Sequence, residues 1–85
     1  MRVEFLGIPR ERVGMAELDL DATATLGQLL TTLERRYPAF SDVADAGRLR
    51  PTFVANLNGD RFVRDPETRL SPGDHVLILS ADAGG

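Results

Sequence analysis

The residues best suited to chemistry stand at the C-terminal end of the chain, which reads HVLILSADAGG over 75–85. A carboxylate is a poor electrophile, and it becomes a good one when it is converted to an acyl adenylate or a thioester. On a terminal Gly85 the acyl carbon is unhindered, and Gly84 has no Cβ to obstruct entry into a narrow partner site. We therefore predict that Gly85 is the reacting residue and that Gly84 gives it access.

The other side chains show no arrangement typical of catalysis. The chain has one histidine, His75, no cysteine, and thirteen acidic residues dispersed along its length. The lack of cysteine excludes a disulfide scaffold, a thiolate metal site and a cysteine nucleophile. A lone histidine among scattered acids is not a catalytic signature. We expect His75 to have a structural role, and we expect no metal and no bound cofactor.

Charge and hydropathy argue against two classes of partner. The 85 residues make one domain with a net charge of −3, which lacks the basic surface of a nucleic-acid-binding protein. No stretch approaches the ~20 apolar residues of a membrane helix, and charged residues interrupt the first twenty positions, unlike a signal peptide. We expect a cytoplasmic protein that binds neither nucleic acid nor membrane.

Lysine is absent, and all ten cationic residues are arginine. Two explanations stand side by side. A GC-rich genome favours arginine codons, and a protein with an activated acyl end gains from having no internal amine to attack it.

The elements that must position the C-terminal end begin with two strands. Alternating apolar residues predict strands over 2–8 and 15–21, and Pro9 and Gly14 indicate a turn and loop over 9–14. Two strands joined by a short loop predict a hairpin.

A helix is predicted over 26–36. Its apolar stripe has the i, i+3, i+4, i+7 spacing of a helix packed on a core. Thr25 is the expected N-cap, Gln28 completes a capping box, and Pro38 ends the helix. The residues of the stripe are Leu26, Leu29, Leu30 and Leu33.

The second half of the chain reads mainly as strands. We expect 39–50 to be irregular, with a short helical turn near 42–46, and a third strand over 51–57. Asn58-Gly59 is a strong hairpin signal that returns the chain through a brief strand. The last strand covers 75–79.

The element order β-β-α-β-β-β predicts an α+β fold. In such a fold a mixed sheet of four to five strands carries one main helix across one face. We place the domain over 1–80 and a flexible tail over 81–85.

One helix cannot cover both faces of the sheet. If Val76 and Ile78 meet the helix, four other apolar residues form a patch on the open face, and such patches commonly mark partner surfaces. The alternative is that the segment 38–50 folds over part of it. The patch residues are Leu6, Val54, Leu77 and Leu79.

The chain resembles the ubiquitin-like β-grasp proteins, and more closely the bacterial sulfur carriers of the MoaD/ThiS family. Besides the element order, the resemblance is carried by RERVG, TLGQLLTTLERRYP, NLNGDRFV and LSPGDHVLILSADAGG. The last motif is the most specific of these, and the resemblance spans nearly the whole chain. The length of the chain and its long 38–50 segment are more similar to the small subunit of molybdopterin synthase than to the shorter thiamine carrier.

The resemblance implies a function for the ending. An E1-like adenylating enzyme would use ATP to activate Gly85, and a sulfur donor would replace AMP to leave a C-terminal thiocarboxylate. The carrier would then deliver sulfur to an acceptor enzyme, such as the large subunit of molybdopterin synthase. Asp82 departs from the small, apolar or proline residues typical of family tails. Its negative charge affects which activating enzyme accepts this tail.

Three alternatives stand beside this interpretation. The chain can be a β-grasp interaction module that uses its sheet face and ignores its terminus. It can be a protein modifier joined to amines, as ubiquitin is. It can also carry sulfur for thiamine or cysteine-type pathways. In each case it has no side-chain active site of its own, and whether it counts as an enzyme depends on the complex that it joins.

Overall fold

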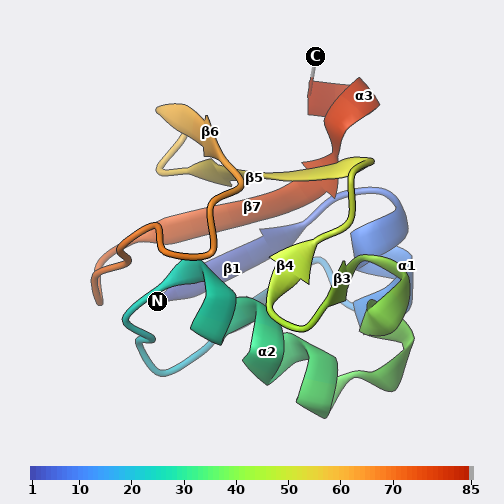
Figure 1. Ribbon diagram of the computed structural model, residues 1–85, viewed down its shortest axis with the longest axis horizontal. Coiled ribbons are helices and arrows are strands. Elements are labelled where there is room, and N and C mark those ends of the chain that lie inside the picture. Colours follow the sequence, from blue (N-terminus) through green and yellow to red (C-terminus); the bar gives the residue numbers. More distant parts are fainter. Residues whose placement is uncertain (85) are drawn as a thin grey trace.

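The computed structural model describes residues 1–84, in which five strands form one sheet in the order β2-β1-β7-β5-β6 (Figure 1). β1 and β7 are parallel, and the other neighbours are antiparallel. The mixed sheet with one helix across it confirms the predicted fold. Its strands are β1 (Arg2–Phe5), β2 (Glu17–Asp19), β5 (Phe53–Leu57), β6 (Arg61–Val63) and β7 (His75–Ser80).

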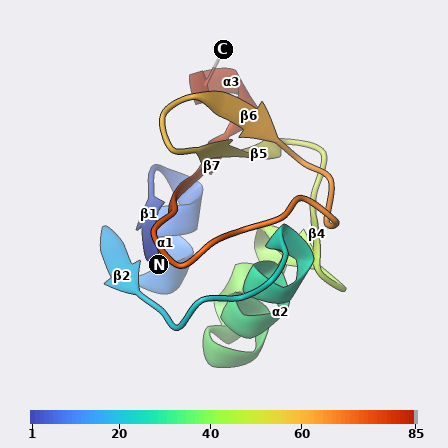
Figure 2. The same ribbon diagram turned by 90° about the vertical axis from the view of Figure 1, so that its left-hand side faces the viewer.

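The main helix is α2 (Leu26–Arg36), with the bounds predicted from the sequence. Figure 2 shows it packed on one side of the sheet, and its four stripe leucines are fully buried. The Thr25 side chain accepts a hydrogen bond from the backbone N–H of Gln28 at 3.2 Å, which confirms the N-cap. The Gln28 side chain reaches back one residue further than a capping box requires, because its Oε1 accepts from the N–H of Ala24 at 2.9 Å.

The prediction of a turn and loop over 9–14 was wrong. These residues belong to a short helix, α1 (Ile8–Val13), which has Pro9 in its first turn and Gly14 as a left-handed C-cap at φ 84°. Proline and glycine mark loops, but a proline in the first turn and a glycine just after the last turn are also typical of the two ends of a helix. Burial of Pro9 and Val13 against the core decides for the helix.

The segment 38–50 lies on the helix side of the sheet and leaves the open face uncovered. A 3-10 helix (Pro38–Asp42) leads into a small hairpin of β3 (Ala44–Asp45) and β4 (Arg48–Leu49). The segment joins the core with α2 through four buried residues, and Phe40 contacts Phe5 edge-to-face at 6.3 Å between ring centroids. The alternative in which this segment covers the patch is therefore wrong. Its buried residues are Phe40, Val43, Ala44 and Leu49.

The turn at Asn58-Gly59 and a second turn over 71–74 meet at the end of the sheet where β7 begins. Asn58 and Gly59 both have positive φ, as the predicted hairpin requires. The Asn58 amide donates to Asp74 Oδ1 at 2.9 Å, and the N–H of Ser71 donates to Asp74 Oδ2 at 2.8 Å. These two hydrogen bonds, the first the stronger, lower the pKa of the Asp74 carboxyl. The motifs NLNGD and LSPGD thus join two turns of the sheet.

None of the helices over residues 1–84 is both long and apolar enough to cross a membrane.

Candidate functional site

The tail begins where β7 ends, at the end of the sheet opposite the turn that contains Asp74. Ser80 pairs with Phe53 of β5, and the N–H of Ala81 donates to the carbonyl of Thr52 at 2.8 Å. One helical turn, α3 (Ala81–Gly84), follows (Figure 1). Gly85 lies outside the described residues, so flexibility over 81–85 and the roles of Gly84 and Gly85 stay predictions. Asp82, in the first turn of α3, is exposed.

Strand pairing shows which side chains share the open face with the base of the tail. Val76 and Ile78 are fully buried in the core beneath the sheet, so the alternate positions Leu77 and Leu79 point to the other face. Across the sheet, Leu79 pairs with Val54. Leu6 follows Phe5 of the core, and its N–H donates to Ile78 at 3.1 Å. The division of the sheet into a helix face and an open face is as predicted.

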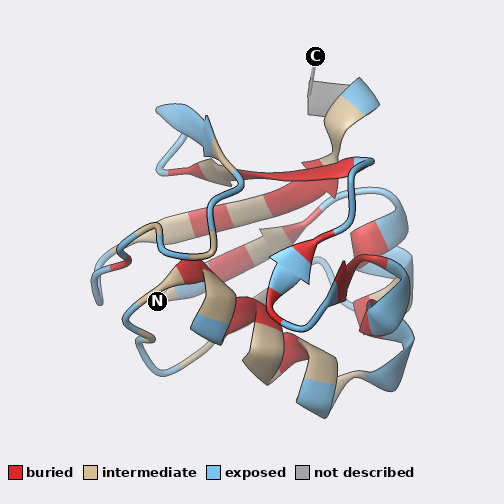
Figure 3. Ribbon diagram, in the orientation of Figure 1, coloured by how far each residue is buried: buried red, intermediate tan, exposed pale blue. Residues whose placement is uncertain are grey.

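The four patch residues differ in exposure more than the sequence predicts. Leu6 is 46% exposed and Leu77 is half-buried, whereas Val54 and Leu79 are only 8% and 4% exposed. Val54 and Leu79 cover one another across the β5–β7 pair, and α3 contacts both strands. Both residues are therefore buried on the open face instead of exposed, and their role in partner binding stays a prediction. Figure 3 colours most of β5 as buried.

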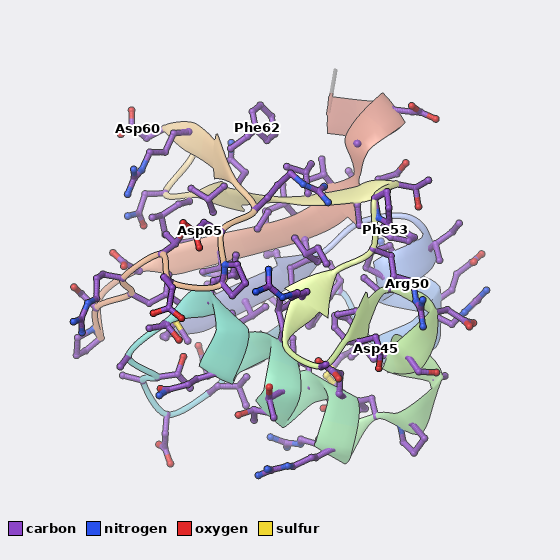
Figure 4. The ribbon with its side chains drawn as sticks, viewed as in Figure 1. Asp45, Arg50, Phe53, Asp60, Phe62 and Asp65 are labelled. Atoms are coloured by element: carbon purple, nitrogen blue, oxygen red, sulfur yellow. The ribbon has the colours of Figure 1, made fainter. Side chains whose placement is uncertain are left out.

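Sequence analysis missed Phe62, the most exposed of the large apolar residues at 53%. It pairs with Asn56, which in turn pairs with Leu77. Figure 4 shows its ring on β6, pointing away from α2. The signal was present, because Val63 packs on the core and alternation then sends Phe62 to the open face. We call Leu6, Phe62 and Leu77 the docking face.

The rest of the open face is polar. Nε2 of His75 lies 2.9 Å from Oε1 of Glu4, and the Arg2 side chain pairs with Glu17. This ion pair, chiefly its hydrogen bond, raises the pKa of the Arg2 guanidinium. The half-buried His75 thus has a carboxylate beside it in the sheet, and residues 1–84 hold no group of three or more acidic or histidine residues placed to bind a metal.

A cavity of about 620 Å³ lies on the helix side, away from the tail. It opens between the first turns of α2 and the hairpin turn at Gly47, and its lining includes Thr25, Gln28 and Arg48. None of the residues that line it belongs to the docking face or to α3. The base of the tail and the docking face therefore lie apart from this cavity.

Comparison with known proteins gives one family and several similar structures. The ThiS family model matches residues 3–85, and no curated protein sequence matches the chain. A Haloferax volcanii protein solved in solution is 29% identical, with a TM-score of 0.76 over 99% of this chain and 84% of that chain. The crystal structure of SAMP1 from Haloferax volcanii is 25% identical, with a TM-score of 0.74 over 99% and 97%.

The same fold is also found in a protein complex. The Amycolatopsis orientalis BexX/CysO complex gives a TM-score of 0.77 at 24% identity, over 99% of this chain and 98% of that chain. Together with the two structures from Haloferax volcanii, it confirms the predicted ubiquitin-like β-grasp fold.

Proposed function

Because this chain belongs to the ThiS family, we propose that it is a sulfur carrier whose C-terminal Gly85 carboxylate receives and delivers the sulfur atom. The observation that carries the proposal is the position of the tail. Ala81 follows directly on β7, whose open-face residue Leu77 belongs to the docking face. A partner that covers Leu77 therefore stands next to the tail.

The chemistry needs an unhindered carboxylate and a partner that activates it. An oxygen of the Gly85 carboxylate attacks the α-phosphorus of ATP on an adenylating enzyme, and pyrophosphate leaves. A sulfide equivalent from a sulfur donor then attacks the acyl carbon, the bond to AMP breaks, and a thiocarboxylate remains. Gly84 lets the chain enter a narrow site without a Cβ in the way. ATP belongs to the partner, and the carrier binds no cofactor of its own.

The docking face supplies the contact that brings the tail to its partner. Fixing a five-residue tail costs on the order of 1–2 kcal/mol per residue, and burying Leu77 and Phe62 against a partner contributes about 1.5–3 kcal/mol for each. The similar Amycolatopsis orientalis structure is a complex of two proteins, which supports the proposal that a chain of this fold binds a protein partner.

For the acceptor we propose an enzyme such as the large subunit of molybdopterin synthase, in the cytoplasm where the activating enzyme and ATP are found. The long 38–50 segment supports this choice over a thiamine carrier. A cysteine-type pathway is the other destination, and the acceptor that takes up the sulfur distinguishes them.

Protein modification is the second candidate function. The observation that favours it is the similarity to SAMP1, the small archaeal modifier protein 1, from Haloferax volcanii, at 25% identity over nearly the whole chain. The first step, adenylation of Gly85, is common to both functions. They differ in the nucleophile that takes the acyl group, which is sulfur in one case and a protein amine in the other.

The fate of the activated end separates the two functions. The protein is incubated with ATP and the adenylating enzyme of the same genome, with and without a sulfur donor, in the presence of a lysine-rich test protein. A sulfur carrier releases pyrophosphate with or without the donor, and it gives a thiocarboxylate only when the donor is present. Covalent adducts on the lysines of the test protein, formed without a donor, would instead establish a modifier. Because this chain has no lysine, lysine adducts cannot join one copy of it to another.

A further inference from the structure

The base of the tail rests on a turn that enters β5. The N–H of Phe53 donates to the carbonyl of Arg50 at 3.0 Å and closes the turn. Between these residues lies Thr52, whose carbonyl accepts the N–H of Ala81. The hydrogen bond from Ala81 is thus the first one after β7. The position of its acceptor, the Thr52 carbonyl, depends on the turn over 50–53.

Arginine side chains hold this turn from two sides. Arg64, directly after β6, donates from Nη1 to the carbonyl of Phe53 and, at a longer 3.4 Å, from Nη2 to the carbonyl of Arg50. Arg50 itself donates from Nε to the carbonyl of Ser41 at 2.7 Å. Figure 4 labels Arg50 and Phe53 at the start of β5. In the sequence, Thr52 thus stands between Arg50 and Phe53, whose carbonyls both accept from the Arg64 guanidinium.

We propose that Arg64 is a positioning residue for the tail. By holding the carbonyls on both sides of Thr52, it fixes the acceptor of the Ala81 N–H and so the direction in which residues 81–85 leave the sheet. A guanidinium suits this role because its planar fork can bind two acceptors at once, which an ammonium cannot do in the same geometry. Holding the base of the tail in one direction lowers the ordering cost that a partner meets on binding.

The role of Arg64 in activation rests on the proposed function, whereas the anchoring of Ala81 does not. Two variants test both parts, Arg64→Gln and Arg64→Lys, beside the control Arg61→Gln. Arg61 begins β6, which Arg64 follows, and its substitution removes the same charge, but it pairs with Leu57 at the other end of the hairpin. The measurements are amide hydrogen exchange and the kinetics of ATP-dependent activation, with KM and kcat for the carrier determined separately.

In Arg64→Gln we expect amide exchange at Ala81 to rise about tenfold, with exchange at Ile78 of β7 unchanged. KM for the carrier should rise about three- to tenfold with kcat unchanged, because the tail, once seated in the partner, has the same chemistry. Arg64→Lys should show both effects to a smaller extent, and Arg61→Gln should show neither.

Unchanged exchange at Ala81 in Arg64→Gln would overturn the anchoring role. Faster exchange at Ala81 with an unchanged KM would overturn the role in positioning. If the activating enzyme does not act on the wild-type protein, the proposed function fails while the exchange measurement still decides the anchor. If Arg64→Gln does not fold, Arg64→Lys gives the same readings on a smaller scale.

Discussion

Removal of Gly85 is expected to reduce ATP-dependent activation of the carrier by more than about 100-fold. Without this residue the terminal carboxylate falls one residue, roughly 3.4 Å, short of its position in the partner site. A misplacement of 1 Å can already cost about 10²-fold in rate. The measurement is pyrophosphate release by the activating enzyme of the same genome.

The fold and the docking face should be untouched by this deletion. Circular dichroism and the melting temperature should match those of the wild type, and the deleted protein should still bind the activating enzyme. Addition of one residue after Gly85 is the matched control for length, and it should be equally inactive. Retained activity in either protein would mean that the terminus is not the reacting group, and a β-grasp interaction module would become the better account.

Leu77→Asp is expected to weaken binding of the activating enzyme about 10- to 100-fold. Burial of a leucine against a partner is worth about 1.5–3 kcal/mol, and each 1.4 kcal/mol corresponds to a tenfold change in Kd. Leu77 is half-buried, so the folded state should persist. The measurement is the Kd of the complex, with the melting temperature beside it.

The neighbours of Leu77 allow charge to be separated from apolar contact. Leu77 pairs with Glu4 on β1, so an aspartate there adds repulsion within the sheet, whereas Leu77→Lys places a cation beside Glu4. Both variants should weaken binding if apolar contact is the cause. Ala39→Asp, at an exposed position of the 3-10 helix, adds the same charge on the helix side and should bind normally. Normal binding by both Leu77 variants would place the docking site elsewhere.

Periodic signals in the sequence predicted most of the fold. The bounds of α2 follow from Thr25, the leucine stripe and Pro38, and the β5–β6 hairpin follows from Asn58-Gly59. Strand alternation divides β7 into two faces, and burial in the core assigns Val76 and Ile78 to the helix face. In each case a short local pattern carries the signal.

The predictions that failed depend on contacts between distant segments. Pro9 and Gly14 are compatible with either a loop or a helix, and burial against the core decides between them. Val54 and Leu79 are buried because β5, β7 and α3 meet, which no local pattern records. The hydrogen bonds of Arg64 to carbonyls more than ten residues away have no periodic signature either.

The measurement that tests the central claim most directly is the intact mass of the protein after incubation with ATP, a sulfur donor and the activating enzyme. The account predicts a gain equal to the exchange of one oxygen for sulfur, which fragmentation assigns to Gly85. This assignment is essential, because oxidation of Met1 or Met15 gives nearly the same gain. An unchanged mass at Gly85, with an enzyme that activates another carrier in the same experiment, would contradict the account.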